Sequence, residues 1–466
     1  YSSASPGLNM SNFYTNVSLV GDGILYRAIE NGVSVKRVVK YQPTLFVPTN
    51  KDSNWRTLEG IPVESFKPGD ISDCRDFVKT YDGTSGISVY GNTEYIYQFI
   101  GEEYIGDIDY KFDDLVVANI DIETTCDGGF PNVENPNEEI IAITVEVDGV
   151  YNSFGVGEFS VTGVGNSIVC HNFRSELDLL SSFLDYWETT KPDIITGWNV
   201  RFFDIPYIVN RIKLLMGEKE ANRLSPWRKI GERTIRRMNR DQTAHELVGI
   251  ATLDYYELYQ TFTYVNQESY RLDHIAFVEL GEKKLSYDEY DSMATFYKSD
   301  FQKFMEYNVK DVELIKKLED KMKLLELSVA LAYSAKVNFV DVFSQVRTWD
   351  AIIYHYLMEH NVVIPPKKAG KKDEQYAGAY VKEPITGMHD WVVSFDLNSL
   401  YPHLIMQYNI SPETKTDDGI RKAISVDGIL GGNHLSLKYL SERKEKDVSI
   451  AANGICYFRD RKGFLP

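Results

Sequence analysis

Residues 116–125, with the sequence VVANIDIETT, are the feature that most constrains the fold of this chain. Apolar and β-branched residues lead into Asp121, Ile122 and Glu123, which predicts a buried strand ending in two acids. Side chains alternate across a strand, so the two carboxylates share one face and Ile122 lies on the other. Two like charges at the edge of a core repel each other, and water, basic residues or a divalent cation must compensate them.

The composition sets the broad class of the chain. Its 466 residues suggest about two to four domains. The formal net charge of −18 argues against a protein that merely coats nucleic acid, but it allows an enzyme with a locally basic groove. Four cysteines without CxxC spacing indicate a reduced, intracellular protein. No run approaches the ~18 apolar residues of a membrane span, so we expect no membrane partner.

The pattern of apolar residues predicts three regions. Residues 10–112 read as short strands broken by turns, an α+β or β-rich domain. Residues 113–325 alternate strands with helices and predict an α/β domain. Residues 326–375 are predicted to be helical and to end in the linker PPKKAGKK. Beyond it, DWVVSFD predicts a strand that ends at Asp396, followed by a helix that starts at Pro402.

One helix within the α/β region is predicted in detail. Ser175 and Asp178 suggest an N-terminal cap, and Pro192 ends the pattern. The expected buried stripe of this helix is Leu177, Leu180, Leu184 and Trp187.

Two further sites carry candidate acids. Asp204, two residues before Pro206, fits either a helix cap or a residue facing the end of a neighbouring strand. Tyr307 and Asp311 are four residues apart, which places them on one helical face, whether solvated or functional. With the pair on the first strand, these residues match the plan of a 3′→5′ exonuclease that uses two divalent cations.

The motifs resemble those of family B DNA polymerases, and within them the replicative enzymes of T-even bacteriophages. DIETT, TGWNVRFFDIPYI and YNVKDV are similar to the three exonuclease motifs. YAGAYVKEP resembles the segment between exonuclease and polymerase, and SFDLNSLYP resembles the first polymerase motif. The resemblance covers nearly the whole chain.

This resemblance implies a set of site residues for the exonuclease. Asp121, Glu123, Asp204 and Asp311 would bind two Mg²⁺ or Mn²⁺ ions, and Tyr307 would orient the attacking water. The fold implied is ribonuclease H-like for residues 113–325. A β-rich N-terminal domain would span residues 1–112, with residues 326–375 returning to it, and residues 376–466 would begin the polymerase palm.

The resemblance also implies residues for polymerisation and DNA binding. Asp396 would bind a palm metal, the carbonyl of Leu397 would help, and Tyr401 would exclude a ribose 2′-hydroxyl. Phe130 would stack on the primer end. The segment around residues 233–255 would hold a hairpin that helps to separate primer from template.

The expected partners are nucleic acids and replication proteins. Two segments are basic, residues 228–240, which include Arg236 and Arg237, and residues 365–372. They would either follow the phosphates of bound DNA or be solvated loops. Single-stranded and primer–template DNA are the expected substrates, with dNTP used only by the complete polymerase. A second polymerase chain or a sliding clamp is the expected protein partner, and the host cytoplasm is the expected location.

Two other functions stay open at this point. The chain could be one subunit of a split polymerase that works by assembling with a second chain. A ribonuclease H-like RNA nuclease would keep the acids but would leave SFDLNSLYP unexplained. Because the family's fingers, thumb and second palm acid are not found in the sequence, we expect exonuclease activity without primer extension.

Overall fold

The computed structural model describes residues 12–82, 84, 87–161, 167–237, 240–366, 379–416, 424–444 and 447–466. Contacts divide the chain into two compact units. The first contains residues 1–45, 65–86 and 92–356, and the second contains residues 46–64, 87–91 and 357–466.

The first unit begins with a three-stranded antiparallel sheet. Its strands are β1 (Asn12–Val20), β2 (Gly23–Glu30) and β3 (Val33–Lys40), in the order β1-β2-β3. Two helices follow, α1 (Ile71–Tyr81) and α2 (Tyr95–Glu103).

A segment far along the chain packs on β1. The hydroxyl of Tyr333 donates to the carbonyl of Tyr14 at 2.7 Å, and the hydroxyl of Tyr14 donates to the carbonyl of Val337 at 2.6 Å. This segment comprises α10 (Leu324–Ala335) and the 3₁₀ turn η3 (Phe339–Phe343), and α11 (Gln345–Glu359) follows it. Both hydrogen bonds are buried, so the late helices and the first strand share one core.

A six-stranded mixed sheet forms the centre of the first unit. Its order is β10-β9-β8-β7-β11-β14, with β7 antiparallel to β8 and parallel to β11. The strands are β7 (Val117–Thr124), β8 (Ile140–Val147), β9 (Val150–Val156), β10 (Ser167–Phe173), β11 (Ile194–Thr196) and β14 (Ala251–Thr252). The predicted strand around Asp121 is therefore confirmed and is flanked on both sides.

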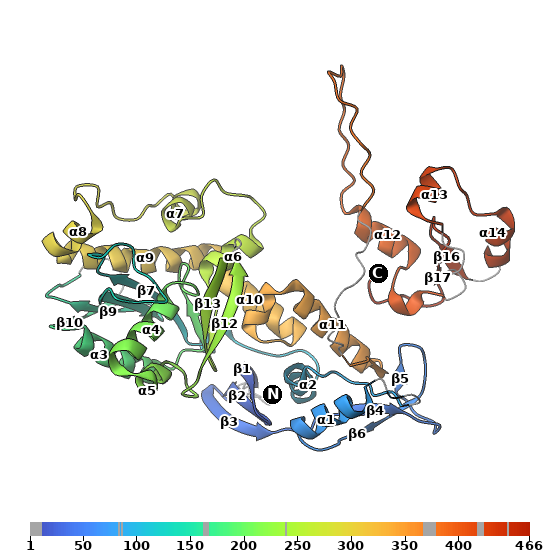
Figure 1. Ribbon diagram of the computed structural model, residues 1–466, viewed down its shortest axis with the longest axis horizontal. Helices are drawn as coiled ribbons and strands as arrows, with labels where there is room; N and C mark the ends of the chain where they lie inside the picture. Colours follow the sequence, from blue (N-terminus) through green and yellow to red (C-terminus); the bar gives the residue numbers. More distant parts are fainter. Residues whose placement is uncertain are drawn as a thin grey trace, which may run out of the picture. The chain divides into compact units, whose positions relative to one another are not determined.

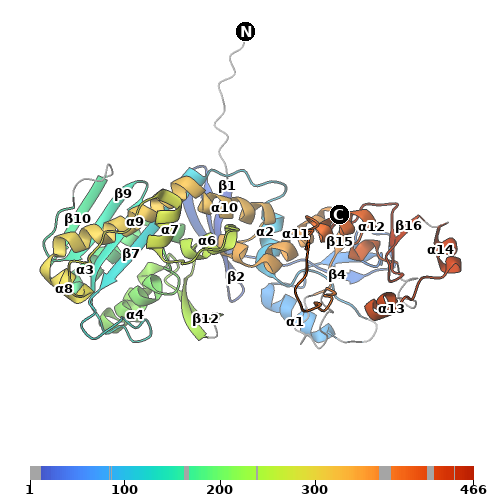
Figure 2. The same cartoon turned by 90° about the horizontal axis from the view of Figure 1, so that it is seen from above.

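Helices cover both faces of this sheet (Figure 1). The long helix α9 (Phe301–Met322) packs on one face, where Phe304, Met305 and Val312 join a core with Tyr151. Helices α3 (Glu176–Thr190) and α4 (Asp204–Met216) pack on the other face. Seen from above, α9 runs across the strands (Figure 2). The other elements of this unit are η1 (Phe112–Asp114), α5 (Glu218–Ala221), η2 (Asn222–Leu224), α6 (Tyr255–Phe262), α7 (Leu272–Leu280) and α8 (Met293–Ser299).

Two local features follow from turn and cap chemistry. Asp148 and Gly149 join β8 to β9 with φ of 50° and 79°, the left-handed pair that suits a tight hairpin.

Ser175 caps α3 by accepting a hydrogen bond from the backbone N–H of Asp178. The predicted stripe of α3 was partly wrong, because Leu177 is 50% exposed. Leu179 and Phe183 are buried along with the other predicted residues of the stripe, so the face that packs on the sheet is rotated from the expected one.

A long hairpin also belongs to the first unit. Strands β12 (Ile230–Arg237) and β13 (Arg240–Leu247) pair in antiparallel register. The side chains of Arg236 and Arg237 lie outside the described residues, as does the linker at residues 367–378.

The second unit is built from short elements. β4 (Leu45–Pro48) pairs with β6 (Val63–Phe66), and β5 (Arg56–Thr57) pairs in parallel with β15 (Val362–Val363). Phe46, Val63 and Val363 form a small core there. The remaining elements are α12 (Leu400–Tyr408), η4 (Pro412–Thr414), α13 (Val426–Leu430), α14 (Leu437–Lys444), β16 (Val448–Ile450) and β17 (Cys456–Phe458).

The strand predicted to end at Asp396 is not formed. Residues 392–396 have no regular structure, and Trp391 and Phe395 are 97% and 90% exposed. A strand needs neighbouring strands to satisfy its backbone N–H and C=O groups, and no described strand pairs with this segment. The helix that follows begins at Leu400, two residues before the expected Pro402.

Candidate active site

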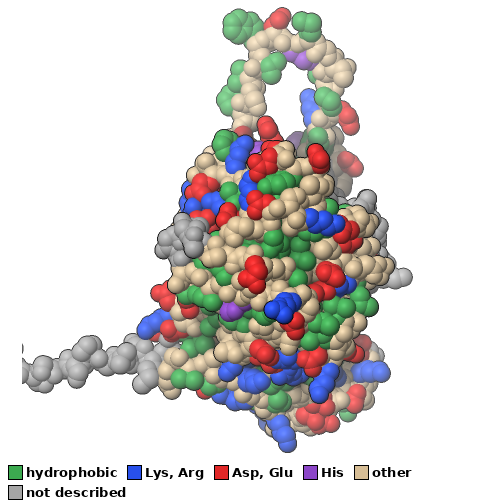
Figure 3. Space-filling view, turned by 90° about the vertical axis from the view of Figure 1, so that its left-hand side faces the viewer, with side chains coloured by type: hydrophobic (Ala, Val, Ile, Leu, Met, Phe, Trp, Pro, Cys, Tyr) green, Lys and Arg blue, Asp and Glu red, His purple; other side chains and the backbone are tan. Residues whose placement is uncertain are grey.

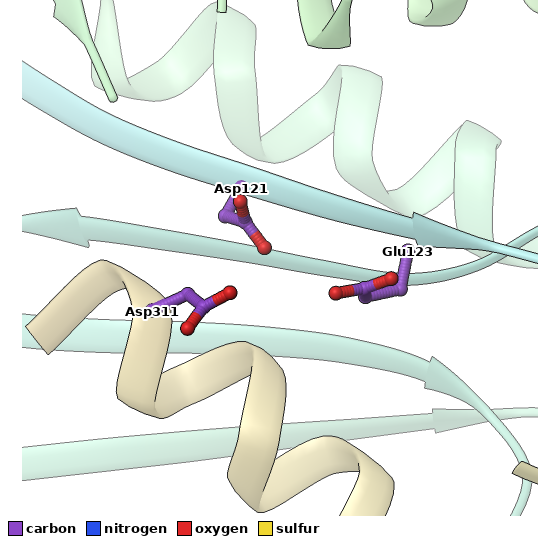
Figure 4. Close-up of side chains that lie close together, drawn as sticks. All are labelled: Asp121, Glu123 and Asp311. Atoms are coloured by element: carbon purple, nitrogen blue, oxygen red, sulfur yellow. The ribbon is translucent and has the colours of Figure 1, made fainter. Parts of the chain in front are cut away.

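The two acids on β7 face a common space with an acid on α9. One ligand oxygen from each of Asp121, Glu123 and Asp311 lies within 4.8 Å of the others (Figure 4). Ile122, between the first two, is 3% exposed and belongs to the core on the opposite face. Alternation along a strand thus separates the apolar and acidic faces as predicted. Asp121 and Glu123 are partly exposed and Asp311 is buried, an arrangement of hard oxygen ligands open to a small cation.

Helix α9 and Lys284, which lies between α7 and α8, make three more contacts at this site. The side-chain amide of Asn308 donates to Asp121 Oδ2 at 2.7 Å. The ammonium of Lys284 donates to the hydroxyl of Tyr307 at 3.2 Å and pairs with Asp311. Tyr307 and Asp311 share one helical face, as their spacing predicted, and Lys284 contacts both side chains.

Asp204 stands beside the three-acid group without joining it. It is 3% exposed, and its Oδ1 accepts the backbone N–H of Ile122 at 3.1 Å. Asp204 is the first residue of α4, whereas Phe203 occupies the cap position and makes no side-chain cap. The carboxylate is therefore directed at β7, between Asp121 and Glu123, and the helix-cap interpretation is wrong.

The loop that places Asp204 is held by a buried acid, Asp254. Asp254 is fully buried and accepts the backbone N–H groups of Asn199 at 2.9 Å, Arg201 at 3.0 Å and Tyr256 at 3.0 Å. Asn199 has φ of 67°, a conformation that costs energy unless the surroundings impose it. Asp254 thus fixes the turn from which α4 begins.

A glycine is required in the same loop. Gly197 has φ of 152°, and a Cβ there would lie 2.4 Å from the carbonyl oxygen of Ile120. The loop therefore passes directly against β7, which brings Asp204 to the acids.

Desolvation raises the pKa of every carboxyl in the site. The pKa of Glu123 rises to about 8, with a further contribution from the charge of Asp311. Burial raises the pKa of Asp204 to about 7 and that of Asp311 to about 6, the latter held down by Lys284. The pKa of Asp121 is raised well above its usual value by burial and by Asp311. A cluster that resists ionisation in this way is one that a cation stabilises.

The other predicted residues do not belong to the three-acid group. Phe130 is 89% exposed, with its ring centroid 6.2 Å from that of Phe203. Asp396, Leu397 and Tyr401 belong to the second unit and are exposed, the last two by 68% and 63%. Within the described ranges, no second group of three metal-binding side chains occurs, so Asp396 belongs to no such group.

Sequence reasoning missed three residues of the site. Asn308 lies three residues before Asp311, a spacing that could have placed it on the same helical face. Lys284 and Asp254 gave no such signal, because each reaches the site from a distant part of the chain.

Two family models match the chain. Residues 90–275 match the exonuclease domain of DNA polymerase family B, and residues 343–453 match DNA polymerase family B itself. The DNA-directed DNA polymerase of Escherichia phage RB69 is 34% identical over 98% of this chain and 52% of its own length.

The chain belongs to the family B DNA polymerases. The DNA-directed DNA polymerase of Enterobacteria phage T4 is 31% identical, again over 98% of this chain and 52% of the relative. The DNA polymerase delta catalytic subunit of Schizosaccharomyces pombe is 24% identical over 64% of this chain and 27% of the relative. The chain thus spans about half the length of the phage polymerases it matches.

The three acids and Asp204 fall in two parts of this family B chain. Asp121, Glu123 and Asp204 lie within the matched exonuclease domain, and Asp311 lies between the two matched ranges. None of the helices in the described residues is long and apolar enough to cross a bilayer.

Proposed function

We propose that this chain is the 3′→5′ proofreading exonuclease portion of a phage replicative DNA polymerase. It would hydrolyse the terminal phosphodiester of single-stranded DNA within a ribonuclease H-like domain. The observation that carries this proposal is the meeting of Asp121, Glu123 and Asp311, with ligand oxygens within 4.8 Å, inside a family B polymerase chain.

The donor set fits a divalent cation, and we propose that two bind, Mg²⁺ or Mn²⁺. All the side-chain ligands are carboxylate oxygens, the type that these hard ions prefer. Asp121, Glu123, Asp204 and Asp311 would hold them. When bound, such ions supply a nucleophilic water at neutral pH and stabilise the charge on the leaving oxygen.

The other side chains support this ligand set. Asn308 holds one oxygen of Asp121 and leaves the other free to bind a cation. Lys284 holds the hydroxyl of Tyr307 and so fixes the phenol one helical turn from Asp311. A phenol held in this way can accept or donate a hydrogen bond to the attacking water, which is the role we propose for it.

The palm residues have a separate proposed role. Asp396, the carbonyl of Leu397 and the ring of Tyr401 would act in nucleotide addition, in the complete polymerase, with primer–template DNA and dNTP as substrates. Their exposure is compatible with a site that further chain completes. No finding supports the alternative of a split-polymerase subunit, and we do not propose it.

The decisive experiment measures degradation of a labelled single-stranded DNA oligonucleotide with Mg²⁺. With a 5′ label we expect a ladder that shortens stepwise, and with a 3′ label we expect mononucleotide from the first time point. A 3′-terminal phosphorothioate should slow the reaction. Faster cleavage of an RNA oligonucleotide would favour an RNA nuclease.

A pair of matched variants separates chemistry from net charge. Asp121→Asn with Glu123→Gln should lower the rate by at least about 100-fold, since both proposed ligands lose charge. The control is Asp148→Asn with Glu134→Gln, which removes the same charge from exposed positions. Equal activity in the two double variants would refute the proposed site.

A further inference from the structure

We propose that a basic cavity in the first unit, separate from the acidic site, binds a phosphate group of a nucleotide or a nucleic-acid strand. The cavity has a volume of about 350 Å³. Strands β2 and β3 line one side, and the end of α3 with the segment 223–228 lines the other. Its apolar lining includes Val35, Trp187, Leu224 and Ile250.

Positive charge dominates the lining. The lining of the cavity contains five cationic side chains and one carboxylate, that of Glu188. The cations are Arg27, Lys36, Lys191, Arg223 and Arg228.

Ion pairs neutralise only some of these cations. Arg27 pairs with Asp193 at 3.0 Å, and Arg228 pairs with Glu188. Arg223 pairs with Glu188, Asp185 and Glu220. Lys36 and Lys191 have no carboxylate partner within the described residues. Two lysines therefore remain to attract an anion.

Side-chain contacts hold Lys36 at the cavity, and the backbone turn that ends α3 places Lys191 there. The ammonium of Lys36 donates to the carbonyl of Pro226 at 2.8 Å and lies 5.5 Å from the centre of the Trp227 ring. Lys191 ends α3 in a left-handed conformation, with φ of 52°, and Arg228 has φ of 53°. Such conformations are uncommon in residues other than glycine. Partial burial and then the charges of Arg27 and Arg228 lower the pKa of Lys36.

The cavity lies away from the acids along the sheet. Asp193, which pairs with Arg27, directly precedes β11 and accepts the N–H of Val116, just before β7 begins. Asp121 and Glu123 lie toward the other end of β7. A ligand in this cavity would therefore be bound at a distance from the proposed site of hydrolysis.

The chemistry fits a phosphate with an attached nucleoside. Ammonium and guanidinium groups bind phosphate oxygens by charge-assisted hydrogen bonds, while the apolar lining suits a sugar and base. A volume of about 350 Å³ is within the range of small-ligand sites. Basic side chains also gather toward the lower edge of the face in Figure 3, among acidic ones, so the net acidity of the chain is not uniform.

The test uses two charge-removing variants, each with a matched control. Lys36→Gln keeps a donor for the Pro226 carbonyl, and Lys40→Gln removes the same charge from the same strand outside the cavity. Lys191→Gly suits the left-handed backbone, and Lys323→Gly changes another left-handed helix end. Melting curves confirm that all four variants are folded.

The probes are inorganic phosphate, deoxyadenosine 5′-monophosphate and a fluorescent oligothymidylate. Binding is measured in EDTA, so that no hydrolysis is needed and failure of the exonuclease proposal leaves this result intact. We expect each cavity variant to weaken binding by about tenfold, the loss of one charge-assisted contact, and the controls to change it little.

The pattern across probes identifies the source of the phosphate. Weakening confined to phosphate and the mononucleotide supports a free nucleotide, and weakening confined to oligothymidylate supports a strand. Weakening of all three supports a site that takes either. The inference is overturned if cavity and control variants bind every probe alike, or if the parent protein binds none.

Discussion

At the scale of residues, a few neutral or cationic partners hold the mutually repelling carboxylates of the site close together. Asn308 holds Asp121, Lys284 holds Asp311, and the backbone of Ile122 holds Asp204. Each contact stabilises one acid, yet burial still raises the pKa of all four. In the absence of a cation, the site therefore costs stability.

Removing this repulsion should stabilise the metal-free protein. We expect Asp121→Asn with Glu123→Gln to raise the melting temperature in EDTA by roughly 2–4 °C for each kcal/mol relieved. Differential scanning fluorimetry of the parent and variant measures this shift. A large fall in melting temperature would mean that these acids are structural.

Asp254 should act as a positioning residue for Asp204. Asp254→Asn keeps a good helix cap for α6 but places an amide N–H against the N–H of Arg201, at a cost of about 1–3 kcal/mol. We expect kcat for oligonucleotide cleavage to fall while KM changes little. Asp178→Asn, at the exposed cap of α3, is the matched control. Unchanged kcat in a less stable Asp254→Asn protein would show a purely structural role.

At the scale of elements, α11 carries a partly buried histidine, His355, that packs against α2. A Cβ on Gly101 would lie 2.5 Å from the His355 ring, so the helices are in close contact. Burial, followed by the charge of Lys336, lowers the pKa of His355 from the usual 6.5 to about 4.

This contact should weaken the fold at acid pH. Between pH 6.5 and about 4 the unfolded chain binds a proton that the native state excludes, so stability falls as the pH drops through that window. We expect His355→Gln to flatten this part of the curve of unfolding free energy against pH. His389→Gln, at an exposed position, is the control. Parallel curves for parent and His355→Gln would contradict the assignment.

At the scale of the whole molecule, the four acids all belong to the first unit. A ligand that binds only the native state stabilises it by RT ln(1 + [L]/Kd), about 2.7 kcal/mol at 100 times Kd. The proposed cations should therefore stabilise the first unit and leave the second unchanged.

Metal removal tests this expectation directly. Adding Mn²⁺ or Mg²⁺ to the EDTA-treated protein should raise the unfolding transition of the first unit, with proton release because bound carboxylates are ionised. Limited proteolysis identifies which unit is protected. The double variant Asp121→Asn, Glu123→Gln should not respond. Equal protection of both units, or of the variant, would show that the cations bind elsewhere.

The sequence alone determined what depends on near neighbours. The alternation in β7 separated Asp121 and Glu123 from Ile122, the Asp-Gly turn joined β8 to β9, and Ser175 capped α3. These features follow from backbone geometry over a few residues, which sequence patterns report directly. The family motifs identified the acids of the site, but they did not show how these acids come together in the fold.

Only the tertiary structure decided the contacts between distant segments. It turned Asp204 from a possible cap into a partner of β7 and brought Lys284 and Asn308 to the acids. Among the described strands, it left none paired with the segment before Asp396. Each outcome depends on which surfaces pack together. Packing and pairing are settled by the whole core and not by local pattern, because a hydrogen-bond partner can come from any part of the chain.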